Sequence, residues 1–218
     1  MMADYSLHCF VQSGNAYKAA LMLELTGASW EPVWVDFFNG ATRTPAYRDL
    51  NEMGEAPVLI DHTEKGEDGR DLVLTQSGLI LHHLAEKTQK FAPASRAEQR
   101  EIMRWILWDN HKLTSYVATY RFLRMFAGKD GSPEAEFLKA RALTALKVLE
   151  GHLTHRDFVV AQRPTIADIS MCGSLYWPSV SGVDGKDHPA IAAWLGRIAN
   201  LERWAAPDAL LPAGPAAA

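Results

Sequence analysis

The hydrophobic periodicity of this 218-residue chain changes near Lys87, and that change most restricts the folds open to it. Before Lys87 the apolar runs are short and turn signals are frequent, as in a sheet with short connections. After Lys87 the strand signals stop, and long stretches show the spacing of amphipathic helices. The sequence therefore predicts an α/β domain followed by an all-α domain.

The first domain, expected at residues 1–87, has the predicted order strand-helix-strand-helix-strand-strand-helix. This order predicts a mixed four-stranded sheet with helices on its faces. The charged segment 62–71 predicts a solvated hairpin loop. The expected strands are 5–11, 30–36, 56–61 and 72–74, and the expected helices are 16–25, 46–51 and 77–86.

The second domain is expected at residues 95–209, after a linker at residues 88–94. Its last helix is expected to begin at His188-Pro189, because proline suits a first helical turn. The Pro- and Ala-rich end, residues 210–218, is expected to be flexible. The helical stretches are 95–126, 133–153, 166–176 and 189–200.

Charge and composition argue against several classes of partner. Twenty-two Lys and Arg stand against 26 Asp and Glu, which gives a formal charge of −4, and no basic cluster suggests nucleic acid or an anionic membrane. No run of about 18 apolar residues predicts a membrane helix, and no secretory signal is visible. Two cysteines, Cys9 and Cys172, fit a reducing compartment. We therefore expect a cytoplasmic globular protein.

Ser13-Gly14-Asn15 lies between the first expected strand and the first expected helix. A hydroxyl and a carboxamide there meet the free N–H groups and the positive end of the helix dipole. Such a place stabilises an anion, and for a thiolate it lowers the thiol pKa from about 8.5 toward neutrality. The alternative is that Ser13 and Asn15 only cap the helix.

Two further segments offer binding contacts. A cis bond at Ala56-Pro57 would leave the backbone groups of Ala56 able to pair with an extended peptide, and the alternative is a trans proline that opens a strand. Ser77 is expected to be an N-cap without a reciprocal capping box, which leaves N–H groups for an external carboxylate. Gln76 beside it has a carbonyl that can accept from an ammonium. A plain N-cap is the alternative there.

A fourth segment, Thr165-Ile166-Ala167-Asp168, predicts a capping box and is assigned to folding. In order and spacing, the four segments resemble the cytosolic glutathione transferases from about Tyr5 to Trp204. The resemblance implies a thioredoxin-like first domain, a helical second domain, usually a homodimer, and glutathione as co-substrate.

The resemblance also implies roles for single residues. Ala56, before a cis Pro57, pairs with the cysteinyl backbone of glutathione. Gln76 and Ser77 hold its γ-glutamyl end. The residue after the first strand activates the thiol, which points to Ser13 and Asn15.

Residues 10–18 look most like the bacterial nu class and the fungal Ure2-like group. That likeness implies transferase activity together with reduction of organic disulfides or hydroperoxides. Tyr17 is expected on the helix and Cys9 in the strand, so neither is expected to act on the thiol. Two residues depart from the pattern: Glu55 replaces a common Lys or Arg and makes the local field more negative, and Thr42 replaces a Gln that contacts the tripeptide.

A second substrate is expected between the domains, against the first helix of the α domain. Trp108, His111, Lys112, Ser115 and Tyr116 share one face of that helix at i, i+3, i+4, i+7 and i+8. This aromatic and basic face suits a flat or anionic acceptor. The alternative is that Trp108 and Tyr116 are interdomain packing.

No metal site is expected. His82 and His83 are adjacent and diverge on a helix, and His152 and His155 have no third ligand nearby. Two alternatives to a glutathione transferase stay open. One is a non-catalytic binding or scaffold module, and the other is a specialised dehalogenase or isomerase of the same fold.

Overall fold

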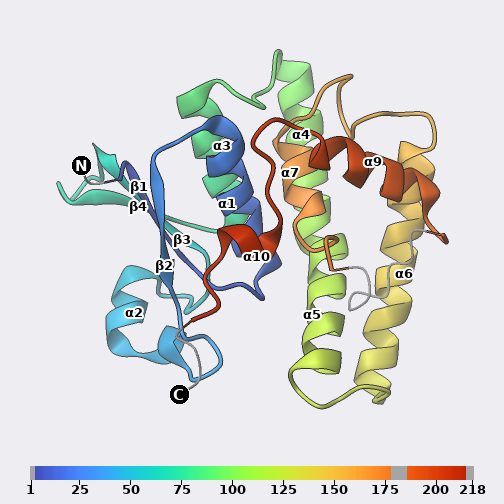
Figure 1. The fold of residues 1–218 in the computed structure, drawn as a ribbon, viewed down its shortest axis with the longest axis horizontal. Coiled ribbons are helices and arrows are strands. Elements are labelled where there is room, and N and C mark those ends of the chain that lie inside the picture. The colour runs from blue at the N-terminus through green and yellow to red at the C-terminus, as the bar shows by residue number, and fades with distance from the viewer. Residues whose placement is uncertain (1–2, 178–185, 215–218) are drawn as a thin grey trace. The chain divides into compact units, whose positions relative to one another are not determined.

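The computed structural model describes residues 3–177 and 186–214. Its contacts divide the chain into two units, Met1–Lys90 with Glu202–Ala218, and Phe91–Leu201. Residues 202–209 were expected in the helical domain and 210–218 were expected to be flexible, but the described part of this segment belongs to the first unit. The reason is that Leu211 is buried there, and α10 (Pro207–Leu210) packs beside α1 (Gly14–Thr26) (Figure 1).

The first unit contains the predicted mixed sheet, with the strand order β2-β1-β3-β4. β1 pairs in parallel with β2 and antiparallel with β3, and β3 pairs antiparallel with β4. The predicted order of elements is confirmed. The remaining elements of this unit are β1 (Tyr5–Cys9), β2 (Trp30–Trp34), η1 (Ala41–Arg43), α2 (Pro45–Leu50), β3 (Val58–Lys65), β4 (Asp71–Thr75) and α3 (Ser77–Thr88).

The hairpin loop is shorter than the predicted segment 62–71, because β3 continues as far as Lys65. His62 Nδ1 lies 2.7 Å from a carboxylate oxygen of Asp71, and Lys65 Nζ lies 2.5 Å from the other. These cross-strand contacts keep charged residues in the ladder, where the charge of the segment alone suggested a loop.

Helices cover both faces of the sheet. α1 and α3 pack side by side against one face (Figure 1), and α2 lies against the other, where Tyr47 meets the His8 ring edge-on at 6.4 Å between centroids. α1 begins at the N-cap Ser13 and ends at Gly27, whose left-handed φ of 73° is typical of a helix C-cap.

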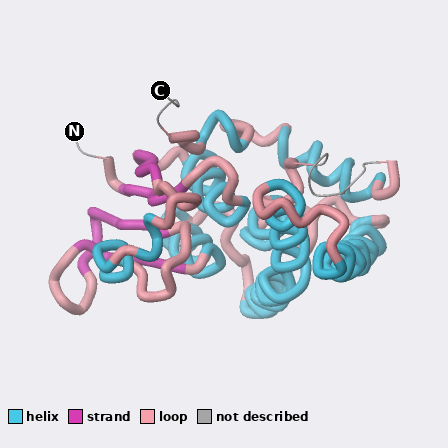
Figure 2. The backbone as a smooth tube through the Cα atoms, turned by 90° about the horizontal axis from the view of Figure 1, so that it is seen from below, coloured by secondary structure: helices cyan, strands magenta, loops and turns pink. Residues whose placement is uncertain are grey.

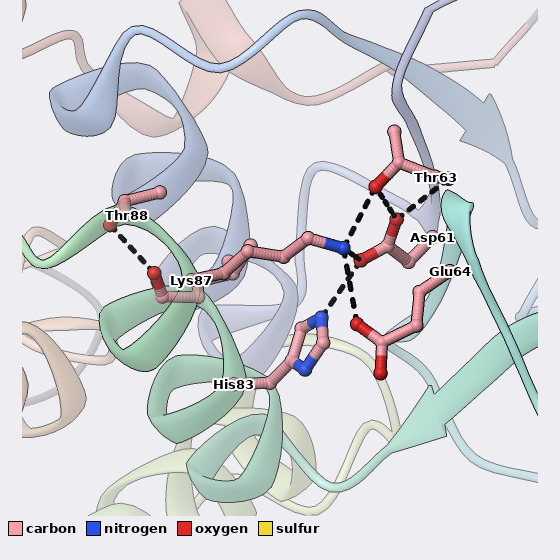
Figure 3. A network of polar contacts seen from close by, with 7 residues as sticks. Asp61, Thr63, Glu64, His83, Lys87 and Thr88 are labelled. Atoms are coloured by element: carbon pink, nitrogen blue, oxygen red, sulfur yellow. Dashed lines mark hydrogen bonds and ion pairs between the residues drawn. The ribbon is translucent and has the colours of Figure 1, made fainter.

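An ion network around the buried Asp61 joins β3 to α3 (Figure 3). One carboxylate oxygen of Asp61 lies 2.6 Å from Lys87 Nζ and 2.9 Å from His83 Nε2, and Thr63 donates to the other oxygen. Burial by itself raises the pKa of Asp61, but the hydrogen bonds from Lys87, Thr63 and His83 outweigh it and lower this pKa to about 2. The network therefore fixes α3 on the sheet.

Asp61, Glu64 and His83 have the spacing of metal ligands, with ligand atoms within 4.8 Å of one another. Lys87 Nζ lies among them, within hydrogen-bonding distance of both carboxylates (Figure 3). The ammonium already supplies the positive charge that a metal ion would bring, so we interpret this group as an ion network.

The second unit consists of helices, turns and loops in its described residues, and Figure 2 shows no magenta strand there. The predicted stretch 95–126 is interrupted by a π-helical turn, at which the buried Asp109 carboxylate accepts from Thr114 and Ser170 at 2.6 Å each.

In the described ranges no helix has the length and apolar character to cross a membrane. The helices are α4 (Arg96–Trp108), the π turn η2 (Asp109–Leu113), α5 (Thr114–Met125), α6 (Pro133–Leu153), α7 (Ile166–Cys172) and α9 (Pro189–Ala199).

Asp168 makes hydrogen bonds in this unit beyond those of a helix cap. Its buried carboxylate accepts from the backbone N–H of Thr165 at 2.8 Å, as the predicted capping box requires, and also from the Thr165 hydroxyl at 3.0 Å. It also accepts from the Val159 N–H at 2.8 Å and from Trp194 Nε1 at 2.9 Å. The cap thus joins α7 to α9 and to the preceding loop.

The Asp61→Asn variant should lose about 2 kcal/mol in free energy of unfolding at neutral pH. The folded-state pKa of about 2 lies below the ordinary value of 3.8, so the contribution is complete above about pH 4 and is lost as the pH falls toward 2. Urea unfolding should therefore show wild type and variant converging over this range. Glu67→Gln, in the exposed hairpin, is the control. A difference that does not change with pH would contradict the prediction.

The Asp168→Ala variant should lose about 3 kcal/mol or more, because it leaves the Val159 N–H and Trp194 Nε1 buried without their acceptor. Ser95→Ala is the matched cap variant, because Ser95 is exposed and caps α4 by one bond to the Glu98 N–H. It should cost about 1 kcal/mol. Equal losses in chemical denaturation would show that the bonds beyond the cap contribute little.

Candidate functional site

The directions of the strands bring three sequence segments to one edge of the sheet. β4 is antiparallel to β3 and so runs in the direction of β1, which places the ends of β1 and β4 and the beginning of β3 at the same edge. Ser13 follows β1, Gln76 follows β4, and Pro57 precedes β3. Ligands of α/β sheets commonly bind beyond the carboxyl ends of strands.

Ser13 is the N-cap of α1 and is half-buried. Its Oγ accepts from the Ala16 N–H at 3.1 Å. This bond uses a lone pair of the oxygen and leaves the hydroxyl proton available to an external acceptor. The two readings of this residue, helix cap and anion contact, are therefore compatible in one geometry.

Asn15 and Ser77 bring the first turns of α1 and α3 together. The Ser77 hydroxyl donates to Asn15 Oδ1 at 3.4 Å, although the two residues are 62 positions apart in the chain. The positive ends of two helix dipoles therefore meet at this point, which favours a negatively charged group.

Gln76, rather than Ser77, is the N-cap of α3, which corrects the predicted cap position. Ser77 already has helical geometry, because the carbonyl oxygen of Gln76 accepts from the N–H groups of Leu79 and Ile80 at 3.0 Å each. The Gln76 side chain makes no capping bond. Its backbone has φ 64°, an uncommon conformation for a residue with a Cβ and one that clusters at functional sites.

The Gln76 amide instead points at Glu55. Nε2 donates to Glu55 Oε2 at 3.0 Å and lies 3.1 Å from the Met53 sulfur. The side-chain oxygen Oε1 of Gln76 accepts no hydrogen bond from the described residues, and it belongs to the amide that bonds to the Glu55 carboxylate. Glu55, the acidic departure from the family pattern, is therefore a direct neighbour of the predicted binding residue.

The Ala56–Pro57 peptide bond is cis. Ala56 forms no backbone hydrogen bond to any other residue in the described ranges, so its N–H and C=O are available to a ligand. The carbonyl before it, that of Glu55, is held by Asn51 Nδ2 at 2.8 Å and by the Tyr47 hydroxyl at 3.0 Å.

Asn51 and Tyr47 were missed as supports of the site. Asn51 is buried, and its Oδ1 also accepts from the Met53 N–H at 3.1 Å. The run Asn-Glu-Met-Gly at 51–54 is a turn signal that pointed to this loop but not to its contacts. Gly54 is required there, because its φ is 65° and a Cβ would lie 2.9 Å from the Thr42 carbonyl. The Thr42 side chain is itself buried.

The other groups considered for thiol chemistry are engaged elsewhere. Burial raises the pKa of the Cys9 thiol to about 12. The Tyr17 hydroxyl donates to the Ala205 carbonyl at 2.8 Å, within the interior of the first unit. His152, considered as a metal ligand, bonds through Nε2 to the Val159 carbonyl at 2.7 Å.

The five residues expected to face a second substrate do not lie on one regular α-helix, because a π-helical turn, which has more residues per turn than an α-helix, lies among them. Trp108 ends α4, His111 and Lys112 lie in the π turn, and Ser115 and Tyr116 begin α5. His111 and Ser115 are exposed and the other three are half-buried. Lys112 Nζ lies 5.9 Å from the centre of the Tyr116 ring.

Two family models match the chain. The model for the glutathione S-transferase N-terminal domain matches residues 3–86, and the model for the C-terminal domain matches residues 113–202. The chain belongs to the glutathione S-transferase family, and its first unit has the thioredoxin-like fold that the resemblance implied.

Particular relatives extend the comparison. The disulfide-bond oxidoreductase YfcG of Escherichia coli K12 is 26% identical over 209 residues, which is 94% of each chain. A possible glutathione S-transferase from Rhodopseudomonas palustris superposes with a TM-score of 0.84 at 32% identity, over 94% of this chain and 90% of that one. A glutathione transferase from Burkholderia graminis, with two glutathione molecules bound per subunit, has a TM-score of 0.81 at 27% identity, over 92% and 85%.

The Gln76→Gly variant should keep the free energy of unfolding or raise it by up to about 1 kcal/mol, because glycine adopts a positive φ without a Cβ penalty. It should also weaken glutathione binding through loss of the amide. Gln89→Gly is the matched control, since Gln89 is exposed and has φ 57° at the other end of α3. Urea unfolding and calorimetric titration with glutathione measure both effects. A loss of binding in both variants would contradict a role for the Gln76 side chain.

Proposed function

We propose that this chain is a glutathione transferase in which Ser13 and Asn15 stabilise the glutathione thiolate. The observation that carries the proposal is the meeting of two helix N-termini at the Asn15–Ser77 contact of 3.4 Å. Glutathione presents a thiolate and a γ-glutamyl carboxylate, and two converging dipole ends suit two anionic groups.

Ser13 supplies the hydrogen bond to sulfur. Its oxygen accepts from the Ala16 N–H, which leaves its proton to donate to the sulfur, and Asn15 adds an amide donor in the same first turn of α1. A hydroxyl and a helix N-terminus both favour the charged form of a thiol and lower its pKa. The protein itself forms no covalent bond, in keeping with the raised pKa of Cys9.

The γ-glutamyl end carries both a carboxylate and an ammonium, and the site has groups for each. The backbone N–H groups at the start of α3, beginning with that of Ser77, suit the carboxylate. The Gln76 carbonyl and the Glu55 carboxylate, which are neighbours through the Gln76 amide, suit the ammonium. Ala56 pairs its backbone N–H and C=O with the cysteinyl residue in the manner of an added strand.

When bound, glutathione supplies the sulfur nucleophile for displacement at an electrophilic carbon or at a disulfide. The likeness to an enzyme named as a disulfide-bond oxidoreductase supports disulfide reduction as a second activity. For the acceptor we propose the face formed by the five residues from Trp108 to Tyr116, whose aromatic and basic groups suit a flat or anionic molecule. A homodimer in the cytoplasm completes the proposal.

Ser13→Ala and Asn15→Ala test the thiolate role. At about pH 6.5, well below the free thiol pKa of about 8.5, each variant should lose about tenfold in kcat/KM with a chlorinated aromatic acceptor and with a mixed disulfide. The control is Ser132→Ala, because Ser132 caps α6 with the same geometry, accepting from the Ala135 N–H at 3.2 Å. It removes a helix cap in the other unit and should leave the rate unchanged.

Wild-type rates in both Ser13→Ala and Asn15→Ala would overturn the thiolate role. A wild-type chain that binds glutathione and raises its melting temperature in glutathione, yet turns over none of the acceptors, would favour the non-catalytic binding module. Turnover of a haloalkane or of a cis-alkene acid, without a conjugate product, would favour the dehalogenase or isomerase.

A further inference from the structure

The last described residues of the chain lie against the turn that carries Ser13. The carbonyl oxygen of Pro212 accepts from the Val11 N–H at 3.1 Å. Val11 lies two residues before Ser13, inside a turn closed by the bond from the Ser13 N–H to the Phe10 carbonyl at 3.1 Å. The C-terminal segment therefore bonds to the same short connection between β1 and α1 that places the Ser13 hydroxyl.

A second contact fixes this segment at Gly214. Gly214 has φ 90°, and a Cβ placed on it would lie 2.7 Å from two ring carbons of Trp34. Trp34 is the last residue of β2, and its strand partner is Cys9, the last residue of β1. A Cβ at Gly214 would therefore displace the exposed Trp34 indole at the sheet edge where the site lies.

The path leading to these contacts is also held in place. The Arg203 guanidinium bonds to the Glu24 carbonyl at 2.8 Å and carboxylate at 2.9 Å, and the Tyr17 hydroxyl donates to the Ala205 carbonyl at 2.8 Å. Leu211 is only 4% exposed. In Figure 1 the red segment leaves α10 and runs along the first unit. It is anchored by α1 before it reaches Val11 and Trp34.

We propose that residues 212–214 form a C-terminal strap that positions Ser13 for thiolate stabilisation, with Gly214 as the residue that lets the strap close on Trp34. This inference rests on the proposed function. Its physical basis is that a hydrogen bond to an anion depends steeply on donor placement, so a shift of about 1 Å in the hydroxyl costs catalysis. The strap acts through Ser13 and touches no reacting atom, so Gly214 is a positioning residue.

Two changes open the strap. Gly214→Ala adds a Cβ against the indole, and deletion of residues 212–218 removes the Pro212 carbonyl while keeping Leu211 in the core. Each has a matched control. Gly69→Ala alters a glycine of similar φ, 77°, in the β3–β4 hairpin with no atom within 4 Å of its Cβ, and deletion of residues 215–218 keeps the strap.

The readout is the pH titration of the bound glutathione thiol, followed by thiolate absorbance, together with kcat and KM for a chlorinated aromatic acceptor. Both strap variants should raise the apparent pKa of the bound thiol by about half a unit to one unit and lower kcat/KM about three- to tenfold at pH 6.5. The melting temperature and the KM for glutathione should change little. Both controls should match wild type.

A double-mutant cycle distinguishes positioning from general stability. In the Ser13→Ala background the strap variants should have no further effect on the thiol pKa, because the group they position is gone. Equal losses in both backgrounds would overturn the strap proposal. If the chain lacking residues 212–218 does not fold, the comparison of Gly214→Ala with Gly69→Ala tests the strap proposal, since each of these variants changes only one side chain.

The two proposals fail in different ways. If Ser13→Ala leaves the thiol pKa unchanged, the proposed role of Ser13 is wrong and the strap has nothing to position. If Ser13→Ala raises that pKa but both strap variants titrate like wild type, the strap proposal alone is overturned.

Discussion

The reversed direction of β3 is the constraint on which the candidate site depends. Because β3 runs against both β1 and β4, the ends of those two strands and the beginning of β3 meet at one edge of the sheet. The turns after β1 and β4 each start a helix, so two helix N-termini converge at the edge that holds Ala56, whose backbone makes no hydrogen bond within the described part of the chain. An all-parallel sheet would have placed the start of β3 at the opposite edge.

The same interactions that stabilise the first unit also place its polar groups. The buried Asp61, neutralised by Lys87 and bonded to His83, holds α3 on the sheet and with it the position of Ser77 (Figure 3). Asn51 holds the Glu55 carbonyl and so the segment before Ala56. Local strain at Gln76 persists in this setting, because the strand before it and the helix after it determine its backbone.

Local signals were enough for much of the fold. Ser13 and Gly27 mark the ends of α1, Ser132-Pro133 marks the start of α6, and Thr165 with Asp168 marks the start of α7. They failed where a distant partner changed the outcome. The bonds of Asp109 to Thr114 and Ser170 accompany the π turn inside the stretch expected as one helix, and the burial of Leu211 keeps the C-terminal segment on the first unit.

The sequence by itself determined the residue types that can carry the chemistry, since a hydroxyl, an amide and a residue followed by proline are recognisable from neighbours in the chain. Only the tertiary structure decided which of these groups meet. The Ser77 bond to Asn15, the Gln76 bond to Glu55 and the Pro212 bond to Val11 join residues 62, 21 and 201 positions apart. Such contacts form only between atoms that are close in space. The neighbours of a residue along the chain do not show which distant residues will lie close to it.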